Sequence, residues 1–250
     1  MPTIDDGTQN IIDILSDVYN VRTTLQKAKL IRPIVPIQDW IISEYYVGPD
    51  AKSIYPFWRN HICNIFDSNR KPEDYISEVI ITGGLGTGKT TIADIIFMRK
   101  LYELSCYDHM QTLFNLMTTA KIAWIYFNLT KEQAELTGYG QLRSLIDSSP
   151  YFREHFPRND KKSTDIEWPD KNMYITYGSS LGHMIGTNLL GSIMDEANFY
   201  QGANVSSTNA AEVQGKAAVL YNNILRRRRK PFYVWRNKSL SINTCIIKFV

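Results

Sequence analysis

The sequence is poor in the residues that build disulfide frameworks and zinc sites. Its 250 residues include only three cysteines, which lie far apart, and four scattered histidines. An odd, widely spaced set of cysteines is typical of a protein from a reducing compartment such as the cytosol. None of the histidines has the spacing of metal ligands, so the sequence carries no sign of a zinc site.

The sequence also lacks a long hydrophobic run and a targeting segment. No apolar stretch reaches the length of a membrane span, and the first residues have no signal-peptide character. Hydrophobic residues make up 44% of the chain and charged residues 21%, which is ordinary for a soluble globular protein. We therefore expect one large domain or two small ones, with no role at a membrane.

Acidic residues are absent from the C-terminal part of the sequence. Between Tyr221 and Val250 there are eight basic residues and no acidic one, although the net charge of the whole chain is only +3. The preceding part is therefore net acidic. Five of the basic residues are consecutive: Arg226, Arg227, Arg228, Arg229 and Lys230. Such an asymmetry predicts either an end that faces nucleic acid or a solvated tail.

One glycine-rich stretch carries the strongest functional signal. Its residues are Gly83, Gly84, Leu85, Gly86, Thr87, Gly88, Lys89, Thr90 and Thr91. They match the phosphate-binding P-loop, and average composition gives a chance match in about one chain in a hundred. A β-branched run before the loop predicts a buried parallel strand, and the apolar pattern after it predicts a helix. Strand, loop and helix in this order aim backbone N–H groups at a phosphate.

The residues of this loop have distinct expected roles. Its glycines let the backbone curl around phosphate oxygens without Cβ clashes. Lys89 would place its charge on the β- and γ-phosphates of a nucleotide, and the Thr90 hydroxyl would bind Mg²⁺. The expected cofactors are therefore ATP and Mg²⁺.

A pair of acids forms the second signal. Asp195 and Glu196 come directly after the apolar strand pattern of residues 189–194, and ligands bind at the carboxyl ends of parallel strands. We expect Asp195 to hold Mg²⁺ through its water shell, and Glu196 to accept a proton from, or orient, the attacking water. The alternative is that the pair merely caps the next helix. An Asp-Glu pair favours ATP hydrolysis of the additional-strand, catalytic-glutamate type over a GTPase switch.

The order of elements predicts an α/β P-loop NTPase of this type, with a mostly parallel central sheet flanked by helices. Strand patterns lie at 79–81, 121–127, 172–177 and 189–194, and helical patterns at 131–136 and around 142–146. Gly138 and Gly140 are expected to interrupt the helical pattern, and 151–170 to be irregular. We divide the chain into a helical N-terminal region (1–72), a P-loop ATPase core (73–232) and a basic, atypical tail (233–250).

An aromatic cluster precedes the P-loop strand. It consists of Tyr55, Phe57 and Trp58 around a proline. Such a cluster usually packs in a core. The functional alternative is a platform on the adenine side of the site, because aromatic faces stack on a base and the cluster lies just before the P-loop strand.

From about Tyr45 to Phe232 the sequence resembles the ATPase domain of the large terminase subunit, the DNA-packaging motor of tailed bacteriophages. The P-loop and the acid pair are shared with many ATPases. Two segments discriminate better: Asp147-Ser148-Ser149-Pro150-Tyr151-Phe152-Arg153, and Gly186-Thr187-Asn188-Leu189-Leu190-Gly191 leading into Asp195-Glu196-Ala197-Asn198-Phe199. The aromatic entry and the arginine cluster also fit the family.

The resemblance implies an ATP-driven motor that moves double-stranded DNA into a procapsid. Its partners would be DNA, the portal protein and the small terminase subunit. It would form a homo-oligomeric ring when active. A monomer in isolation is the alternative oligomeric state. Its place would be the cytoplasm of the infected bacterial host and, transiently, the procapsid portal.

The resemblance also implies an arginine finger, because a guanidinium near the γ-phosphate stabilises charge in the transition state. The favoured candidate is Arg143, acting from a neighbouring subunit. Arg153 and the arginine cluster at 226–229 are the other candidates. The cluster, together with Lys230, would otherwise contact the DNA backbone or a subunit interface, or form a solvated helix end.

The sequence departs from this family on its C-terminal side. A full-length large terminase carries a nuclease with clustered carboxylates for two metal ions. After Glu196 the only acid is Glu212, so we expect no nuclease activity and interpret the chain as the ATPase half. The coupling motif expected beyond the arginine cluster is not clearly present, since Ser241–Thr244 is a poor substitute.

Two other interpretations stay open beside a Mg²⁺-dependent ATPase motor. One is a truncated terminase that binds nucleotide or portal without turnover. The other is a helicase-like ATPase, although the sequence holds no second ATPase half. The intact set of Lys89, Thr90, Asp195 and Glu196 favours an enzyme.

Overall fold

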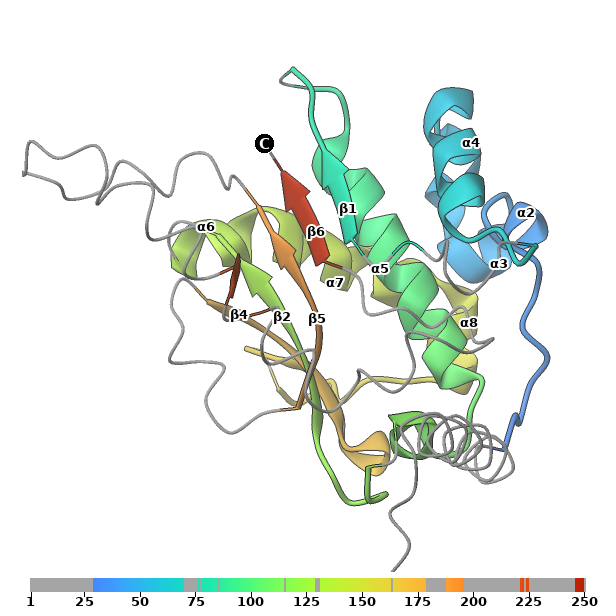
Figure 1. Ribbon diagram of the computed structural model, residues 1–250, viewed down its shortest axis with the longest axis vertical. Helices are drawn as coiled ribbons and strands as arrows, with labels where there is room; N and C mark the ends of the chain where they lie inside the picture. The colour runs from blue at the N-terminus through green and yellow to red at the C-terminus, as the bar shows by residue number, and fades with distance from the viewer. Residues whose placement is uncertain are drawn as a thin grey trace, which may run out of the picture.

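Figure 1 shows the computed structural model of the protein. It describes residues 29–69, 76, 78–84, 86–114, 116–128, 131–162, 164–178, 188–195, 221–222, 224 and the backbone of 246–249. Several sequence predictions lie outside these residues: Leu85 of the P-loop, Glu196 beside Asp195, and the arginine cluster with Lys230. The helical pattern expected before residue 29 lies outside them as well.

A six-stranded sheet forms the centre of the described part. Its strands are β1 (Glu78–Ile81), β2 (Ile122–Phe127), β3 (Ile166–Trp168), β4 (Met173–Gly178), β5 (Asn188–Met194) and β6 (Ile246–Phe249). Their order across the sheet is β1-β6-β5-β2-β4-β3. All neighbours pair in parallel except β3 and β4, which are antiparallel. The predicted mostly parallel sheet is confirmed.

Strands β2 and β5 are buried on both faces. β2 is buried at every position, and β5 at every position after its first. Their continuous apolar runs follow from this, because a parallel strand covered on both sides has no solvent face. On one face, Trp124 packs edge-on against Phe97 of helix α5 (Lys89–Ser105), with ring centroids 4.3 Å apart. On the other face, Ile125 and Phe127 form a smaller cluster with Ile224.

Strand β6 lies between β1 and β5 and pairs in parallel with both. Lys248 is opposite Ile80 on one side and Met194 on the other. This differs from the predicted division, which ended the ATPase core at residue 232 and left 233–250 as a tail. The strand is only four residues long and follows a basic stretch, so its apolar character did not stand out as a core element.

Helix α5 runs between the sheet and the N-terminal helices (Figure 1). The N-terminal elements are α2 (Ile37–Trp40), α3 (Glu44–Val47), a 3-10 turn (Pro49–Ser53) and α4 (Pro56–Ile65). Because α5 is covered on two sides, it is buried from Ile92 to Ser105. Residues of the predicted N-terminal region and of the P-loop core therefore share one hydrophobic cluster.

Three further helices follow β2: α6 (Lys131–Leu136), α7 (Gly138–Ser148) and α8 (Pro150–His155). The predicted span of α6 is confirmed, but two other expectations were wrong. Gly138 and Gly140 lie inside the first turn of α7. Residues 151–170 contain most of α8, all of β3 and the start of a 3-10 turn at Pro169–Lys171. No helix in the described ranges is long and apolar enough to cross a membrane.

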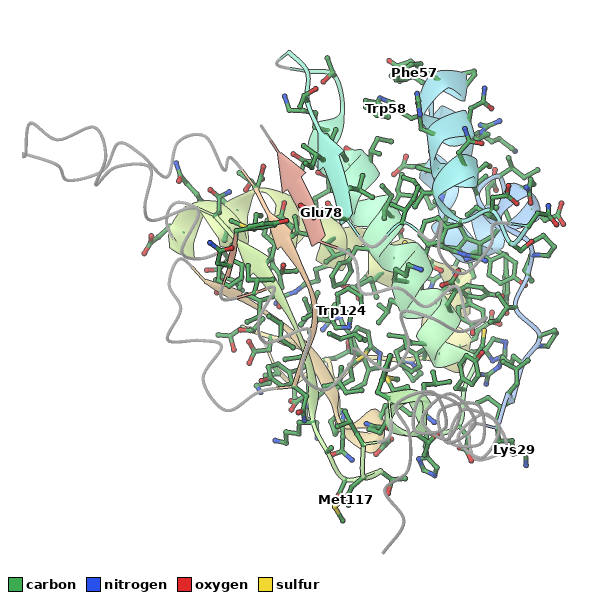
Figure 2. All side chains as sticks on the ribbon, in the orientation of Figure 1. Lys29, Phe57, Trp58, Glu78, Met117 and Trp124 are labelled. Carbon is green, nitrogen blue, oxygen red and sulfur yellow. The ribbon has the colours of Figure 1, made fainter. Side chains whose placement is uncertain are left out.

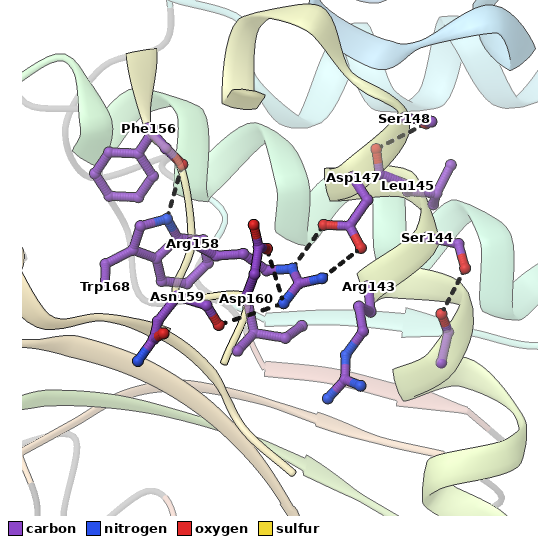
Figure 3. Close-up of polar contacts among 12 residues, drawn as sticks. Arg143, Ser144, Leu145, Asp147, Ser148, Phe156, Arg158, Asn159, Asp160 and Trp168 are labelled. Carbon is purple, nitrogen blue, oxygen red and sulfur yellow. Dashed lines mark hydrogen bonds and ion pairs between the residues drawn. The ribbon is translucent and has the colours of Figure 1, made fainter. Parts of the chain in front are cut away.

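The segment from Asp147 to Arg153, which carries much of the terminase resemblance, ties the helices together. Arg158 donates to Asp147 through two bonds, from Nε to Oδ1 at 2.6 Å and from Nη2 to Oδ2 at 2.9 Å (Figure 3). Ser149 caps α8 by accepting from the backbone N–H of Phe152, and its hydroxyl donates to the Tyr46 carbonyl. These contacts give the segment a structural role, because they join α7 and α8 to the N-terminal helices.

Candidate functional site

The P-loop connects β1 to α5 in the predicted order. β1 ends at Ile81, and α5 begins at Lys89 after Gly88, whose φ of 79° is a left-handed conformation that favours glycine. A Cβ placed on Gly84, Gly86 or Gly88 would meet no atom within 4 Å. The space beside these glycines is therefore open, which lets phosphate oxygens approach the backbone N–H groups.

Lys89 lies across the loop rather than pointing away from it. Its Nζ donates to the carbonyl of Gly83 at 2.6 Å and to that of Gly84 at 3.0 Å. The Thr87 hydroxyl donates to the Gly84 carbonyl at 2.9 Å. The ammonium is thus already held at the loop, and a phosphate group arriving there would meet a positive charge together with the N-terminus of α5.

Asp195 lies at the carboxyl end of β5, as the sequence predicted. Its backbone N–H donates to the Phe127 carbonyl, which continues the sheet ladder to the end of β2. The Tyr126 hydroxyl donates to Asp195 Oδ2 at 3.2 Å. Both side chains are buried, so the hydroxyl restricts the direction of the carboxylate.

The N-terminus of α7 packs against both halves of this site. A Cβ on Gly138 would overlap the Tyr126 hydroxyl and would lie 3.0 Å from Thr90 Cγ2, so this close approach requires glycine. Three residues later, Gln141 Nε2 donates to the Thr91 hydroxyl at 2.7 Å. Gly138 and Gln141 were not among the predicted site residues, because a glycine and a glutamine in a helix give no functional signal of their own.

Asp94 is a second acid near Asp195, and sequence reasoning missed it. It lies on α5, one turn after Thr90, and it is completely buried. Neither of its carboxylate oxygens has a hydrogen-bond partner within the described part of the chain. Burial raises the pKa of the Asp94 carboxyl well above its usual range, and the charge of Asp195 raises it further. The available signal was an acid inside the otherwise apolar run Ile92–Ile96.

These residues fit a nucleotide with Mg²⁺. The open space at the glycines and the Lys89 ammonium suit phosphates, and the orphaned Asp94 carboxylate lies near Thr90 and Asp195, whose oxygens are the kind that Mg²⁺ prefers. Among the described residues, no group of three or more His, Cys, Asp or Glu side chains forms a metal centre. Mg²⁺ is commonly bound by one or two carboxylates together with substrate phosphates, which agrees with this smaller set.

Two cavities flank Trp58 on α4, whose indole Nε1 donates to the Thr87 carbonyl at 3.0 Å. The larger, of about 790 Å³, lies beside β1 and is bordered by Phe57, Trp58, Gly83 and Thr87. Figure 2 shows Phe57 and Trp58 on the side of α4 that faces β1.

The smaller cavity has a volume of about 300 Å³ and opens at the start of α5. Gly88, Thr91, Tyr55, Trp58 and Gln141 are among its lining residues. The three predicted aromatic residues therefore all lie next to the P-loop, but they do not share one cavity: Tyr55 borders the smaller, Phe57 the larger and Trp58 both.

Arg143, the favoured arginine finger, is directed elsewhere within its own chain. Its Nη2 donates to the Thr164 carbonyl at 3.3 Å, and its guanidinium lies over the Tyr139 ring. Residues two apart lie on nearly opposite sides of a helix, so Arg143 and Gln141 cannot both face Thr91. Arg153 is exposed on α8. A finger supplied by a neighbouring subunit stays a prediction.

The parallel sheet, the glycine-rich loop between β1 and α5, and the buried Asp195 at the end of β5 together define a P-loop nucleotide-binding domain. The chain belongs to the family described as "Uncharacterized protein MJ0330, N-terminal P-loop domain", whose model matches residues 43–223, well over half of the sequence. The match starts just before α3, so it includes the helices beside the P-loop, and it ends before β6. No curated protein and no solved structure matches the chain. The family supports a P-loop NTPase and does not point specifically to a phage terminase.

Proposed function

We propose that the protein is a Mg²⁺-dependent ATPase of the additional-strand, catalytic-glutamate type. The observation that carries this proposal is the position of β6 between the P-loop strand β1 and the strand β5 that leads to Asp195. One further strand thus separates the two halves of the site, and Glu196 follows Asp195 directly in the sequence. A carboxylate next to the metal-binding aspartate is well suited to activating water.

Each residue would perform a separate part of the hydrolysis. Lys89, now bonded to two loop carbonyls, would bind the β- and γ-phosphates. Thr90 and Asp195 would hold Mg²⁺, which when bound neutralises phosphate charge. The Tyr126 hydroxyl would keep Asp195 oriented, and Glu196 would orient the attacking water or accept its proton.

We place the base of the nucleotide in the smaller cavity. The Lys89 ammonium lies at Gly83 and Gly84 and therefore marks the end of the loop that receives the terminal phosphates. The smaller cavity opens at the other end, at Gly88 and Thr91, whereas the larger one opens at Gly83. Tyr55 and Trp58 supply the aromatic surfaces there, and Gln141 supplies a polar group.

This location predicts a difference between two neighbouring aromatic residues. Tyr55→Leu is expected to weaken ATP binding about fivefold, because one aromatic contact with the base is worth on the order of 1 kcal/mol. Phe57→Leu serves as the matched control, since Phe57 is similarly exposed but borders only the larger cavity. Binding is measured by titrating a fluorescent ATP analogue. If Phe57→Leu weakened binding of the analogue and Tyr55→Leu did not, the base would be assigned to the larger cavity instead.

The proposed task of the ATPase is translocation of double-stranded DNA, as the resemblance to large terminase ATPase domains implies. DNA, a portal protein and a small terminase subunit are the proposed partners, and the working form would be a homo-oligomeric ring. Support comes from the sequence: the segments quoted for the resemblance and the basic stretch at 226–230. Phosphate contacts of such basic residues would be independent of DNA sequence.

Hydrolysis with and without DNA tests this proposal. We expect duplex DNA of mixed sequence to raise the rate of phosphate release several-fold at protein concentrations that allow a ring to form, and the stimulation to fade with added salt. Oligomeric state is followed in parallel by light scattering. A rate of ATP hydrolysis that is the same with and without DNA would contradict the proposed motor function. The proposed ATPase activity would still stand. Absence of turnover under all these conditions would instead favour a binding module.

A further inference from the structure

Asp94 is a buried acid without a hydrogen-bond partner in the described part of the chain. It is fully buried on α5, and neither carboxylate oxygen accepts a hydrogen bond within the described residues. A buried polar group normally has a partner, and an unpaired buried charge is among the costliest features of a folded protein. The absence of a partner among the residues that the structure describes therefore points to a bound ligand or proton.

The position of Asp94 relates it to the candidate metal ligands. Residues four apart lie on the same face of a helix, so Asp94 is on the face of α5 that carries Thr90, one turn deeper. Asp195 at the end of β5 is near enough to act on the Asp94 carboxyl electrostatically. Three oxygen-bearing side chains thus gather where α5 meets the carboxyl end of β5.

The basic side chains of α5 are engaged with other groups. Lys89 Nζ donates to the carbonyls of Gly83 and Gly84. At the far end of α5, Arg99 and Lys100 both pair with Glu103, at 3.0 and 3.3 Å. No basic side chain in the described ranges makes a hydrogen bond to Asp94, so that part of the chain gives the Asp94 carboxyl no cationic partner.

We propose that Asp94 and Asp195, with the Thr90 hydroxyl, bind a divalent cation in the absence of nucleotide. In the usual P-loop arrangement, much of the coordination of Mg²⁺ comes from the nucleotide phosphates and water. Here a second carboxylate supplies an additional hard oxygen ligand and another negative charge. The cation therefore binds before the nucleotide, and the phosphates of the nucleotide coordinate it afterwards. This inference rests on the proposed nucleotide site but concerns a property of the empty protein.

Binding of Mn²⁺ to the full chain without nucleotide tests this proposal. The protein is stripped with EDTA, exchanged into metal-free buffer and titrated with Mn²⁺, and free Mn²⁺ is followed by electron paramagnetic resonance. We expect one Mn²⁺ per chain, competed by Mg²⁺, and an affinity at least tenfold lower in Asp94→Asn. Asp39→Asn is the matched control, since it removes a charge from an exposed acid on α2, and it is expected to bind like the unchanged protein.

Two results would overturn the proposal. The first is an unchanged protein that binds no Mn²⁺ until nucleotide is added, and this result does not depend on whether any variant folds. The second is an Asp94→Asn variant that binds Mn²⁺ as tightly as the unchanged protein. Thermal unfolding gives an independent measurement, because Mg²⁺ alone should raise the Tm of the unchanged protein but not that of Asp94→Asn.

Failure of the cation site and failure of the nucleotide site are separable. Binding of the fluorescent ATP analogue in EDTA depends on the P-loop alone, and we expect Asp94→Asn to retain it. Loss of Mn²⁺ binding with retained analogue binding supports the assignment of Asp94. A protein that binds Mn²⁺ but no nucleotide would reject the ATPase while supporting the cation site.

Discussion

Glu196→Gln is expected to retain ATP binding and to lower the turnover rate by about 10²–10⁴-fold, the usual contribution of a general base. Glutamine has nearly the shape of glutamate, but it carries no charge and cannot take a proton from water. The proposed ligands of the nucleotide and the metal, Lys89, Thr90 and Asp195, are unchanged in this variant. Turnover is measured as phosphate release at saturating ATP, and binding with the fluorescent analogue.

Glu212→Gln is the matched control for this variant, because Glu212 is the only other acid that follows Asp195 in the sequence. It is expected to turn over ATP like the unchanged protein. Unchanged turnover in Glu196→Gln would remove Glu196 from the mechanism. Loss of analogue binding in Glu196→Gln would assign it to binding rather than to activation of water.

Lys89→Ala is expected to lose most of its affinity for ATP and to reduce turnover by about 10²–10³-fold or more, in line with removal of a single donor that stabilises transition-state charge. The Lys89 ammonium is the charge held at the loop, through the carbonyls of Gly83 and Gly84. Both glycines are exposed, so water can satisfy these carbonyls in the variant and the fold should not change.

The control for Lys89→Ala is Lys52→Ala, which removes an exposed lysine whose ion pair with Glu44 lies on the surface. Surface pairs contribute little to stability, so nucleotide binding and unfolding temperature should both stay the same. If Lys89→Ala bound ATP as tightly as this control, the P-loop would not be the nucleotide site. A large fall in the unfolding temperature of Lys89→Ala would show a structural role for the lysine instead.

The P-loop and its neighbours could be predicted from the sequence because their signals are local. Each signal falls within a short stretch of sequence: a β-branched run before Gly83 and an apolar periodicity after Thr90. The structure has a strand at the first and a helix at the second, as expected. Asp195 was predicted for the same reason, as a polar residue directly after an apolar strand. The predicted role of each of these side chains follows from elementary chemistry and still awaits measurement.

Other parts could not be predicted because they depend on contacts between distant segments. Gly138 was expected to break a helix, but the approach of α7 to the Tyr126 hydroxyl requires a residue without a side chain there. Asp94 looked like one polar residue in an amphipathic helix, whereas covering α5 on both sides buries it. Only the fold shows that Asp94 and Asp195, about a hundred residues apart in the sequence, are near each other.

The resemblance to large terminases illustrates a related limit. Its discriminating segment includes Asp147, Ser149 and Tyr151, and these residues hold α7, α8, α3 and α5 together through Arg158, Tyr46 and Ser105. Residues that stabilise a framework are informative about architecture, and they say little about what the framework acts upon. DNA translocation therefore depends on the stimulation experiment rather than on this segment.

The location of β6 has a consequence for how the protein is made. Among the described strands, β1 pairs only with β6, and the two are separated by well over half of the chain. After the ribosome has added Ile81, it must still synthesise all of β2 to β5 before it reaches β6, the strand that pairs with β1. Pairings of such long sequence separation form slowly and expose strand edges meanwhile. The ATP-binding loop at the end of β1 is thus translated early but gains its supporting neighbour late, so chaperone binding during synthesis should centre on the β1 edge.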